Sequence, residues 1–108
     1  MKQLSNNKDV LSEYSVILFT SPTCNPCKQM KTTIEELEKS HADKANFYEV
    51  DTTTNRKLSK KYNIKSVPTV VFKKDNKITD RFAGFIDTVD IESKLMNLLF
   101  GFDEDFLM

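Results

Sequence analysis

Pro22-Thr23-Cys24-Asn25-Pro26-Cys27 is the stretch around which this chain is organised. It holds both cysteines of the 108-residue sequence, between a strand-like apolar run and a helix-like segment. Cysteines at positions i and i+3 of a helix lie on one face, with their Cβ atoms about 5–6 Å apart. Because a disulfide typically joins Cα atoms about 5.5–6 Å apart, the pair can open and close with little backbone movement. The spacing therefore predicts a redox switch.

Composition indicates an ordinary soluble globular protein. Hydrophobic residues make up 39% of the chain and charged residues 30%, and 108 residues suffice for a hydrophobic core without extra cross-links. The 16 basic side chains balance 16 acidic ones, so net charge favours neither nucleic acid nor an anionic membrane. We therefore expect one domain over residues 1–108 that acts as a monomer and binds neither nucleic acid nor membrane.

The start of the chain shows no targeting signal. Residues 1–9 are polar and lack the apolar stretch of a signal peptide, and no run approaches the ~18 apolar residues of a membrane span. Because the initiating Met is present, we expect that no leader has been removed and that the protein is cytoplasmic. Thiols are kept reduced in that compartment, where a lasting structural disulfide is uncommon.

The hydrophobic period changes on either side of the cysteines. Ser15–Thr20 is a continuous apolar run that predicts a strand buried on both faces. From Pro26 to about Ser40 the period is helical, with an inward stripe made of Met30, Ile34 and Leu37. Ala45–Asp51 predicts the next strand. This order of strand, helix and strand implies parallel pairing through a right-handed crossover.

Shorter signals flank this unit. Met1–Leu4 could form an edge strand, and Asn6 or Asn7 could cap a short helix through Val10, Leu11 and Tyr14. We interpret His41, which continues the apolar stripe, as a helix-terminal histidine favoured by the helix dipole.

The second half predicts a short helix, a hairpin and a final helix. Arg56–Tyr62 forms the short helix, and Asn63 follows it in left-handed conformation. Thr69–Phe72 and Ile78–Phe82 pair around the turn residues Lys74-Asp75-Asn76. Gly84 breaks the strand, and Asp87 caps a helix that Gly101 ends. The buried stripe of that helix consists of Ile91, Leu95, Leu98 and Leu99, and residues 102–108 form a frayed acidic and aromatic tail.

This order of elements, with the CxxC opening the second helix, resembles the thioredoxin family over nearly the whole chain. The resemblance depends on three motifs: Cys24-Asn25-Pro26-Cys27-Lys28, Tyr62-Asn63-Ile64-Lys65-Ser66-Val67-Pro68-Thr69 and Phe82-Ala83-Gly84. A CxxC followed about forty residues later by Val-Pro-Thr entering a strand is far more specific than a CxxC alone.

The resemblance implies an α/β thioredoxin fold, in which a mixed central sheet is flanked by helices on both faces. It implies reduction of protein disulfides, with Cys24 as the nucleophile at the helix start and Cys27 as the resolving thiol. Asn25 and Pro26 would tune the redox potential. Substrate would bind at four residues, Thr23, Val67, Pro68 and Gly84, with a cis peptide bond between Val67 and Pro68. No bound cofactor or metal is implied, and thioredoxin reductase would supply the electrons.

The chain also departs from the family pattern. Thr23 replaces the usual Trp, Asn25 replaces Gly, and Thr32 stands where many members have a kinking proline. Leu18 and Phe47 occupy the positions of a buried acid and its lysine partner. Because Leu18 cannot help to deprotonate Cys27, we expect the resolving step to be slow near neutral pH, or to use solvent or another base.

Other interpretations stay open. A glutathione-linked, glutaredoxin-like protein would share Val67-Pro68, although only Gly84-Phe85-Ile86-Asp87 stands where that family usually has Gly-Gly-x-Asp. A non-catalytic module with the same fold would bind a partner without using its thiols. A structural disulfide would close too short a loop to constrain the chain strongly. A zinc site needs about four ligands, and Cys24, Cys27 and the distant His41 would have to be completed by another molecule.

Overall fold

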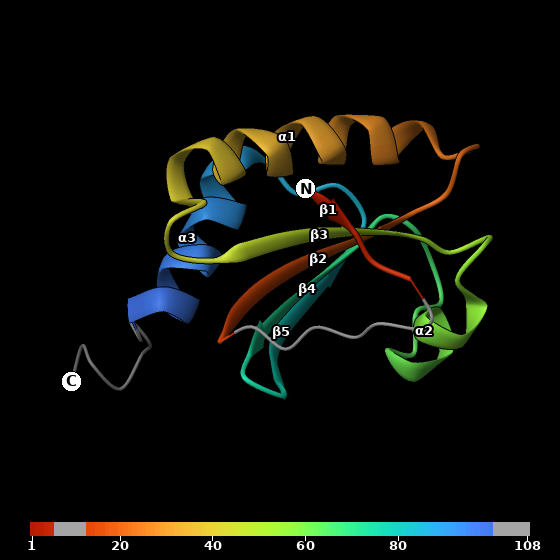
Figure 1. The fold of residues 1–108 in the computed structure, drawn as a ribbon. Helices are drawn as coiled ribbons and strands as arrows, with labels where there is room; N and C mark the ends of the chain where they lie inside the picture. Colours follow the sequence, from red (N-terminus) through yellow and green to blue (C-terminus); the bar gives the residue numbers. More distant parts are fainter. Residues whose placement is uncertain (6–12, 101–108) are drawn as a thin grey trace.

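A computed structural model describes residues 1–5 and 13–100 of the chain. The elements follow in the order β1 (Lys2–Gln3), β2 (Tyr14–Thr20), α1 (Asn25–His41), β3 (Asn46–Asp51), α2 (Arg56–Lys61), β4 (Thr69–Lys74), β5 (Lys77–Ala83) and α3 (Thr88–Phe100). Within the described residues the strands form one sheet in the order β1-β3-β2-β4-β5 (Figure 1). Pairing is parallel among β1, β3 and β2, and antiparallel from β2 through β4 to β5, so the predicted mixed sheet is confirmed.

Strand β2 lies in the middle of the sheet, and its apolar side chains alternate between the two faces. Val16 and Leu18 belong to the core cluster on one face, whereas Ile17 and Phe19 belong to the cluster on the other. All four are fully buried. A strand with four consecutive apolar residues can bury them all only when both of its faces are covered, as the sequence predicted.

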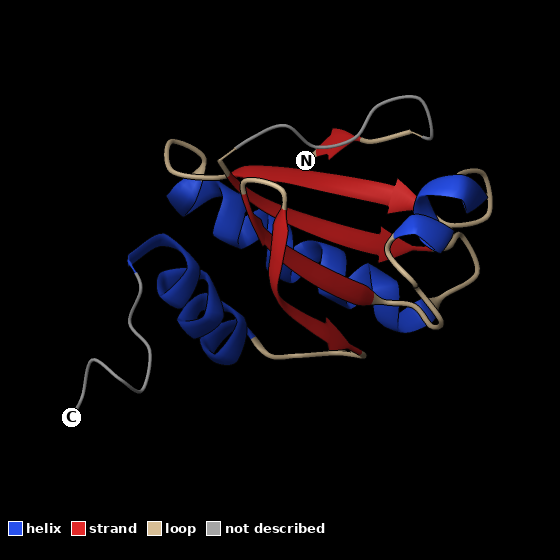
Figure 2. Ribbon diagram, turned by 90° about the horizontal axis from the view of Figure 1, so that it is seen from below, coloured by secondary structure: helices blue, strands red, loops and turns tan. Residues whose placement is uncertain are grey.

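Helices cover both faces of the sheet. The first core cluster contains Met30 of α1 and Ile91 of α3, and the second contains Leu58 of α2. Figure 2 shows α1 and α3 on one side of the strands and α2 near one end of the sheet. The α/β arrangement expected from the sequence is therefore confirmed.

Helix α1 begins directly after Cys24, whose side chain caps it by accepting a hydrogen bond from the Cys27 amide at 3.1 Å. Pro26 lies in the first turn, where its missing N–H costs nothing. The predicted stripe of Met30, Ile34 and Leu37 is buried. Thr32 donates its hydroxyl to the carbonyl oxygen of Lys28 at 3.1 Å, within a helix that runs unbroken through this position.

Local backbone signals in the second half are also confirmed. Asn63, after α2, has a φ of 56°, and Gly84, after β5, has a φ of 91°. The Asp87 carboxylate accepts a hydrogen bond from the Asp90 amide at 3.0 Å and so caps α3. The predicted turn was wrong at Lys74, which is the last residue of β4 and pairs with Lys77, because Asp75 adopts a φ of 55° and closes a two-residue turn.

The remaining sequence predictions fall partly outside the residues that the structure describes. Met1–Leu4 contributes β1, the edge strand beside β3. The proposed short helix after Asn6 or Asn7 lies outside the described residues except at Tyr14, where it was wrong because Tyr14 begins β2. Gly101 and the tail also lie outside them. None of the helices in residues 1–5 and 13–100 is long and apolar enough to cross a membrane.

Candidate active site

Three sequence motifs meet at one end of the sheet. Phe19 of β2 is the register partner of Thr69 of β4, and Thr69 is in turn the partner of Ala83 of β5. The loop that leads to Cys24 begins after Thr20, the residue next to Phe19. The Val67-Pro68 pair directly precedes Thr69, and Gly84 directly follows Ala83. The three motifs that the sequence singled out therefore leave adjacent strands at the same level.

The cysteine pair forms a disulfide at the mouth of α1. Cys24 and Cys27 are bonded through their sulfur atoms, and their Cα atoms are 5.3 Å apart. Cys24 is partly exposed, whereas Cys27 is only 3% exposed. The disulfide-compatible spacing predicted from the sequence is confirmed, and one sulfur is far more accessible than the other.

The electrostatic setting at the helix start favours a negative charge on Cys24. Helix α1 has 17 residues and no acidic side chain in its first turn, so its unpaired amides present a partial positive charge there. Thr23, Asn25 and Pro26 are exposed around the disulfide. A thiolate at this position would be stabilised by the amides and open to a partner.

The Val67-Pro68 segment lies against Gly84. The pairing of β4 with β5 runs to Thr69 and Ala83, and beyond it the Gly84 amide donates a hydrogen bond to the Pro68 carbonyl oxygen at 2.8 Å. The peptide bond between Val67 and Pro68 is cis. Val67 is half-buried and Pro68 is buried. Phe85, directly after Gly84, is 51% exposed and adds an apolar ring that the sequence analysis did not single out as a contact residue.

Leu18 and Phe47 pack against other apolar side chains. Leu18 and Phe47 are 0% and 2% exposed and belong to the same core cluster. Neither side chain can accept or hold a proton. The two positions that the resemblance assigns to a buried acid and a lysine therefore hold buried hydrocarbon side chains in this chain.

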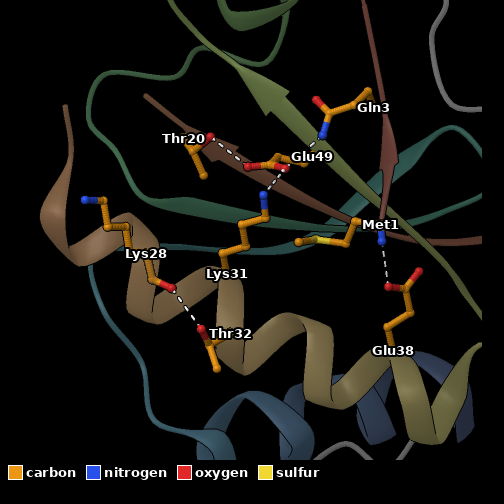
Figure 3. Close-up of polar contacts among 8 residues, drawn as sticks. All are labelled: Met1, Gln3, Thr20, Lys28, Lys31, Thr32, Glu38 and Glu49. Carbon is orange, nitrogen blue, oxygen red and sulfur yellow. Dashed lines mark hydrogen bonds and ion pairs between the residues drawn. The ribbon is translucent and has the colours of Figure 1, made fainter. Parts of the chain in front are cut away.

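A carboxylate that the sequence analysis missed lies nearby. Glu49 of β3 is only 8% exposed, and it lines a cavity of about 330 Å³ together with Cys24 and Cys27. Figure 3 shows its carboxylate between Thr20 of β2, Gln3 of β1 and Lys31 of α1. Gln3 donates to Oε1 at 2.9 Å, Lys31 Nζ lies 3.2 Å from Oε1, and the Thr20 hydroxyl donates to Oε2 at 3.2 Å.

A faint signal for Glu49 was present in the sequence. It is a charged residue inside the predicted strand, two positions after Phe47 and directly before Val50. Since side chains two apart on a strand point to the same face, Glu49 had to share the face of Phe47. What the sequence could not show is that α1 and β1 bring polar partners to this position.

The cysteines and the histidine do not form a metal site within one chain. The cysteine pair lies at the start of α1 and His41 at its end, about 20 Å away along the helix axis. Among residues 1–5 and 13–100, no group of three or more His, Cys, Asp or Glu side chains has the proximity of a metal site.

Comparisons with known proteins place these motifs in context. The thioredoxin family model matches residues 2–97. The chain is 35% identical over 92 residues to a thioredoxin of Mycoplasmoides gallisepticum, covering 85% of this chain and 86% of that protein. It is 33% identical over 67 residues to a thioredoxin of Bacillus subtilis, covering 62% of this chain and 64% of the relative, slightly less than two thirds of its length.

Solved structures agree with these relatives. The germline-specific thioredoxin Deadhead of Drosophila melanogaster superposes with a TM-score of 0.73 at 29% identity, covering 80% of this chain and 81% of that one. A thioredoxin of Fasciola hepatica gives a TM-score of 0.72 at 29% identity, covering 79% and 80%.

Proposed function

This chain belongs to the thioredoxin family, and from that premise we propose that it reduces disulfides in other proteins through Cys24 and Cys27. One observation carries the proposal: an accessible and a buried cysteine form a disulfide at the start of a long helix. Such a pair can exchange two electrons without moving the backbone. The reaction therefore needs no bound cofactor, because the sulfur atoms themselves carry the electrons.

The proposed cycle begins with Cys24. Its thiolate attacks one sulfur of a substrate disulfide, forms a mixed disulfide and expels the first substrate thiolate, which takes a proton from water. The Cys27 thiolate then attacks Cys24, and the second substrate sulfur leaves as a thiolate and is protonated. The enzyme ends as the Cys24–Cys27 disulfide, and the substrate ends as two thiols.

Substrate contacts are proposed at the end of the sheet where the three motifs meet. Thr23 and Gly84 flank the disulfide and the Pro68 loop, and an extended substrate segment would pair with the backbone of Val67 as an added strand. The exposed ring of Phe85 would enlarge the apolar part of this surface. Asn25 and Pro26, between the cysteines, would set the redox potential.

The wider setting of the reaction is part of the same proposal. Thioredoxin reductase would return the disulfide to the dithiol form, in the cytoplasm, with the chain acting as a single-domain monomer. The net charge of zero and the absence of a membrane-spanning helix within the described residues are compatible with this setting.

A coupled reduction assay tests the proposal. Insulin disulfides serve as substrate, and NADPH consumption is followed with thioredoxin reductase in one arm and with glutathione and glutathione reductase in the other. We expect turnover only in the first arm, and its loss in Cys24→Ser. Turnover only with glutathione would support the glutaredoxin-like alternative. Inactivity in both arms would refute the reductase proposal and favour the binding module.

A further inference from the structure

We propose that Glu49 is the proton acceptor for Cys27 in the resolving step, acting through water in the cavity that both residues line. This inference rests on the proposed function, since it concerns the second half of that cycle. Glu49 of β3 would accept the Cys27 proton, which Leu18 of β2 cannot do.

The resolving step creates the need for a base. An ordinary cysteine thiol has a pKa of about 8.5, so it is mostly protonated at neutral pH and is then a poor nucleophile. Cys27 is 3% exposed, so bulk water has little direct access to its proton. The side chains at positions 18 and 47 belong to the core cluster on the same face of the sheet as α1, and as hydrocarbon they accept no proton. A proton acceptor must therefore be reached through the cavity.

Register and packing place Glu49 at that cavity. Leu18 and Glu49 are Cα partners in the parallel pairing of β2 with β3, so their side chains leave the sheet on the same face. This is the face covered by α1, from which Lys31 reaches the carboxylate. The cavity of about 330 Å³ is large enough for several waters, each of which occupies about 30 Å³ in the liquid. A proton can thus pass from Cys27 to Glu49 through water.

The partners of Glu49 hold its carboxylate in one orientation. Oε1 receives the amide of Gln3 and the ammonium of Lys31, at 2.9 and 3.2 Å. Among the described residues, only the Thr20 hydroxyl donates to Oε2, at 3.2 Å. Since a carboxylate oxygen can accept two hydrogen bonds, Oε2 keeps an acceptor site for a cavity water.

The proton and the electrons then balance. The Glu49 carboxylate takes the Cys27 proton through water and becomes a carboxylic acid. The Cys27 thiolate attacks Sγ of Cys24, the bond between Sγ and the substrate sulfur breaks, and its electron pair leaves with the substrate. That thiolate takes a proton from solvent, and Glu49 releases its own proton to the cavity water, which resets the site.

Asp51 is the competing carboxylate at the same cavity. Its Oδ1 accepts hydrogen bonds from the amide and the hydroxyl of Thr53, at 2.8 and 2.6 Å, so that oxygen is committed to the loop after β3. The other charged groups lining the cavity are Lys28 and Lys31 of α1, which cannot accept a proton while charged. Glu49 is the more buried of the two carboxylates, at 8% exposed against a half-buried Asp51, so we assign the role to Glu49 and take Asp51→Asn as the matched control.

The test separates the two halves of the cycle. Reduced protein is mixed with the aromatic disulfide dithiobis(nitrobenzoate), and release of coloured thionitrobenzoate is followed by stopped flow. The first equivalent reports the attack by Cys24, and the second reports resolution by Cys27. Rates are measured from neutral pH to above pH 9 for the wild type, Glu49→Gln and Asp51→Asn.

We expect Glu49→Gln to leave the first phase unchanged and to slow the second about tenfold at neutral pH, less than the ~10²-fold of a directly placed base. The difference from the wild type should shrink as the pH rises, because alkaline solution removes the thiol proton without help from a carboxylate. Asp51→Asn should change neither phase. An unchanged second phase, equal slowing of both phases, or the same defect in Asp51→Asn would overturn the assignment. A missing first phase in the wild type would instead refute the proposed reductase function.

Discussion

Leu18 and Glu49 are Cα partners in the parallel pairing of β2 with β3. The Leu18 side chain is apolar, whereas the Glu49 carboxylate is held by three polar partners. Leu18 is 0% exposed and packs into the core, and Glu49 faces the cavity beside Cys27. The active-site end of the sheet therefore has a carboxylate on β3, one strand away from the apolar Leu18 of β2. Substitutions at these two positions should therefore affect the resolving step and the free energy of unfolding differently.

Moving the acid tests whether strand position matters. In a Glu49→Gln background, Leu18→Asp places a carboxylate on the neighbouring strand and the same face, so we expect it to restore part of the second phase at neutral pH. The measurement is the same stopped-flow trace. Leu18→Asn in that background is the matched control, because it is polar but takes up no proton. Equal rates for the Asp and Asn variants would contradict the prediction.

Leu18→Asp alone should be strongly destabilising. The substitution buries a carboxylate in the apolar core, on the strand next to Glu49, so we expect the free energy of unfolding to fall by about 3 kcal/mol or more at neutral pH. Urea unfolding at neutral and acidic pH measures this loss, which should shrink as the new acid is protonated. A variant as stable as the wild type at neutral pH would show that position 18 tolerates charge.

Cys27→Ser should accumulate mixed disulfides. Cys24 would still attack substrates, but no second thiol would release them, so proteins in a cell lysate should remain attached through Cys24. Non-reducing electrophoresis followed by mass spectrometry identifies these adducts. Cys24→Ser is the control and should capture none. Adducts formed equally well by both variants would contradict the order of attack.

His41→Leu should stabilise the protein. The ring of His41 is at the end of α1 and 6% exposed, and among the described residues neither ring nitrogen has a hydrogen-bond partner. Nε2 lies 3.6 Å from a Glu92 oxygen, a contact that gains charge attraction only when the ring is protonated. Because leucine would fill this buried position without an unpartnered polar atom, we expect a gain of about 1 kcal/mol in the free energy of unfolding at pH 8.

Urea unfolding at pH 8 measures this gain. Glu92→Gln, which keeps His41, is the control and should leave stability unchanged at that pH. A loss of stability in His41→Leu would show that the imidazole makes a net favourable contribution where it is buried.

Gly84→Ala should lower stability through the backbone rather than through a clash. A Cβ at this position would meet no atom within 4 Å, but φ is +91°, a conformation that L side chains rarely adopt. We expect a loss of about 1–2 kcal/mol in the free energy of unfolding, measured by urea titration. Ala83→Ser, at the neighbouring exposed position, is the control. An equally stable Gly84→Ala would mean that the loop relaxes to negative φ.

The main elements could be predicted because their signals are local. The apolar run Ser15–Thr20 needs cover on both faces wherever it lies, and the stripe from Met30 to Leu37 has a helical period in any surroundings. Asp87 caps α3 through a bond to Asp90 only three residues away. Such features depend on neighbours in the sequence, which the sequence displays directly.

The site was only partly predictable because Glu49 depends on distant neighbours. Its partners come from β1, β2 and α1, at sequence separations that no periodicity reveals. The error at Lys74 has a related cause: the turn is closed by Asp75 in a left-handed conformation, and no glycine marks its position. A non-glycine residue with positive φ gives a weak sequence signal.

Burial of β2 on both faces has a consequence for recognition. The strand that leads into the cysteine loop is packed from two sides, and the two cysteine Cα atoms are as close as a closed bond requires. The dithiol and disulfide forms of the protein would thus have nearly the same backbone structure. A reductase acts on the disulfide form, whereas a substrate disulfide reacts with the dithiol form. Each would have to distinguish the two forms through direct contact with the sulfur atoms.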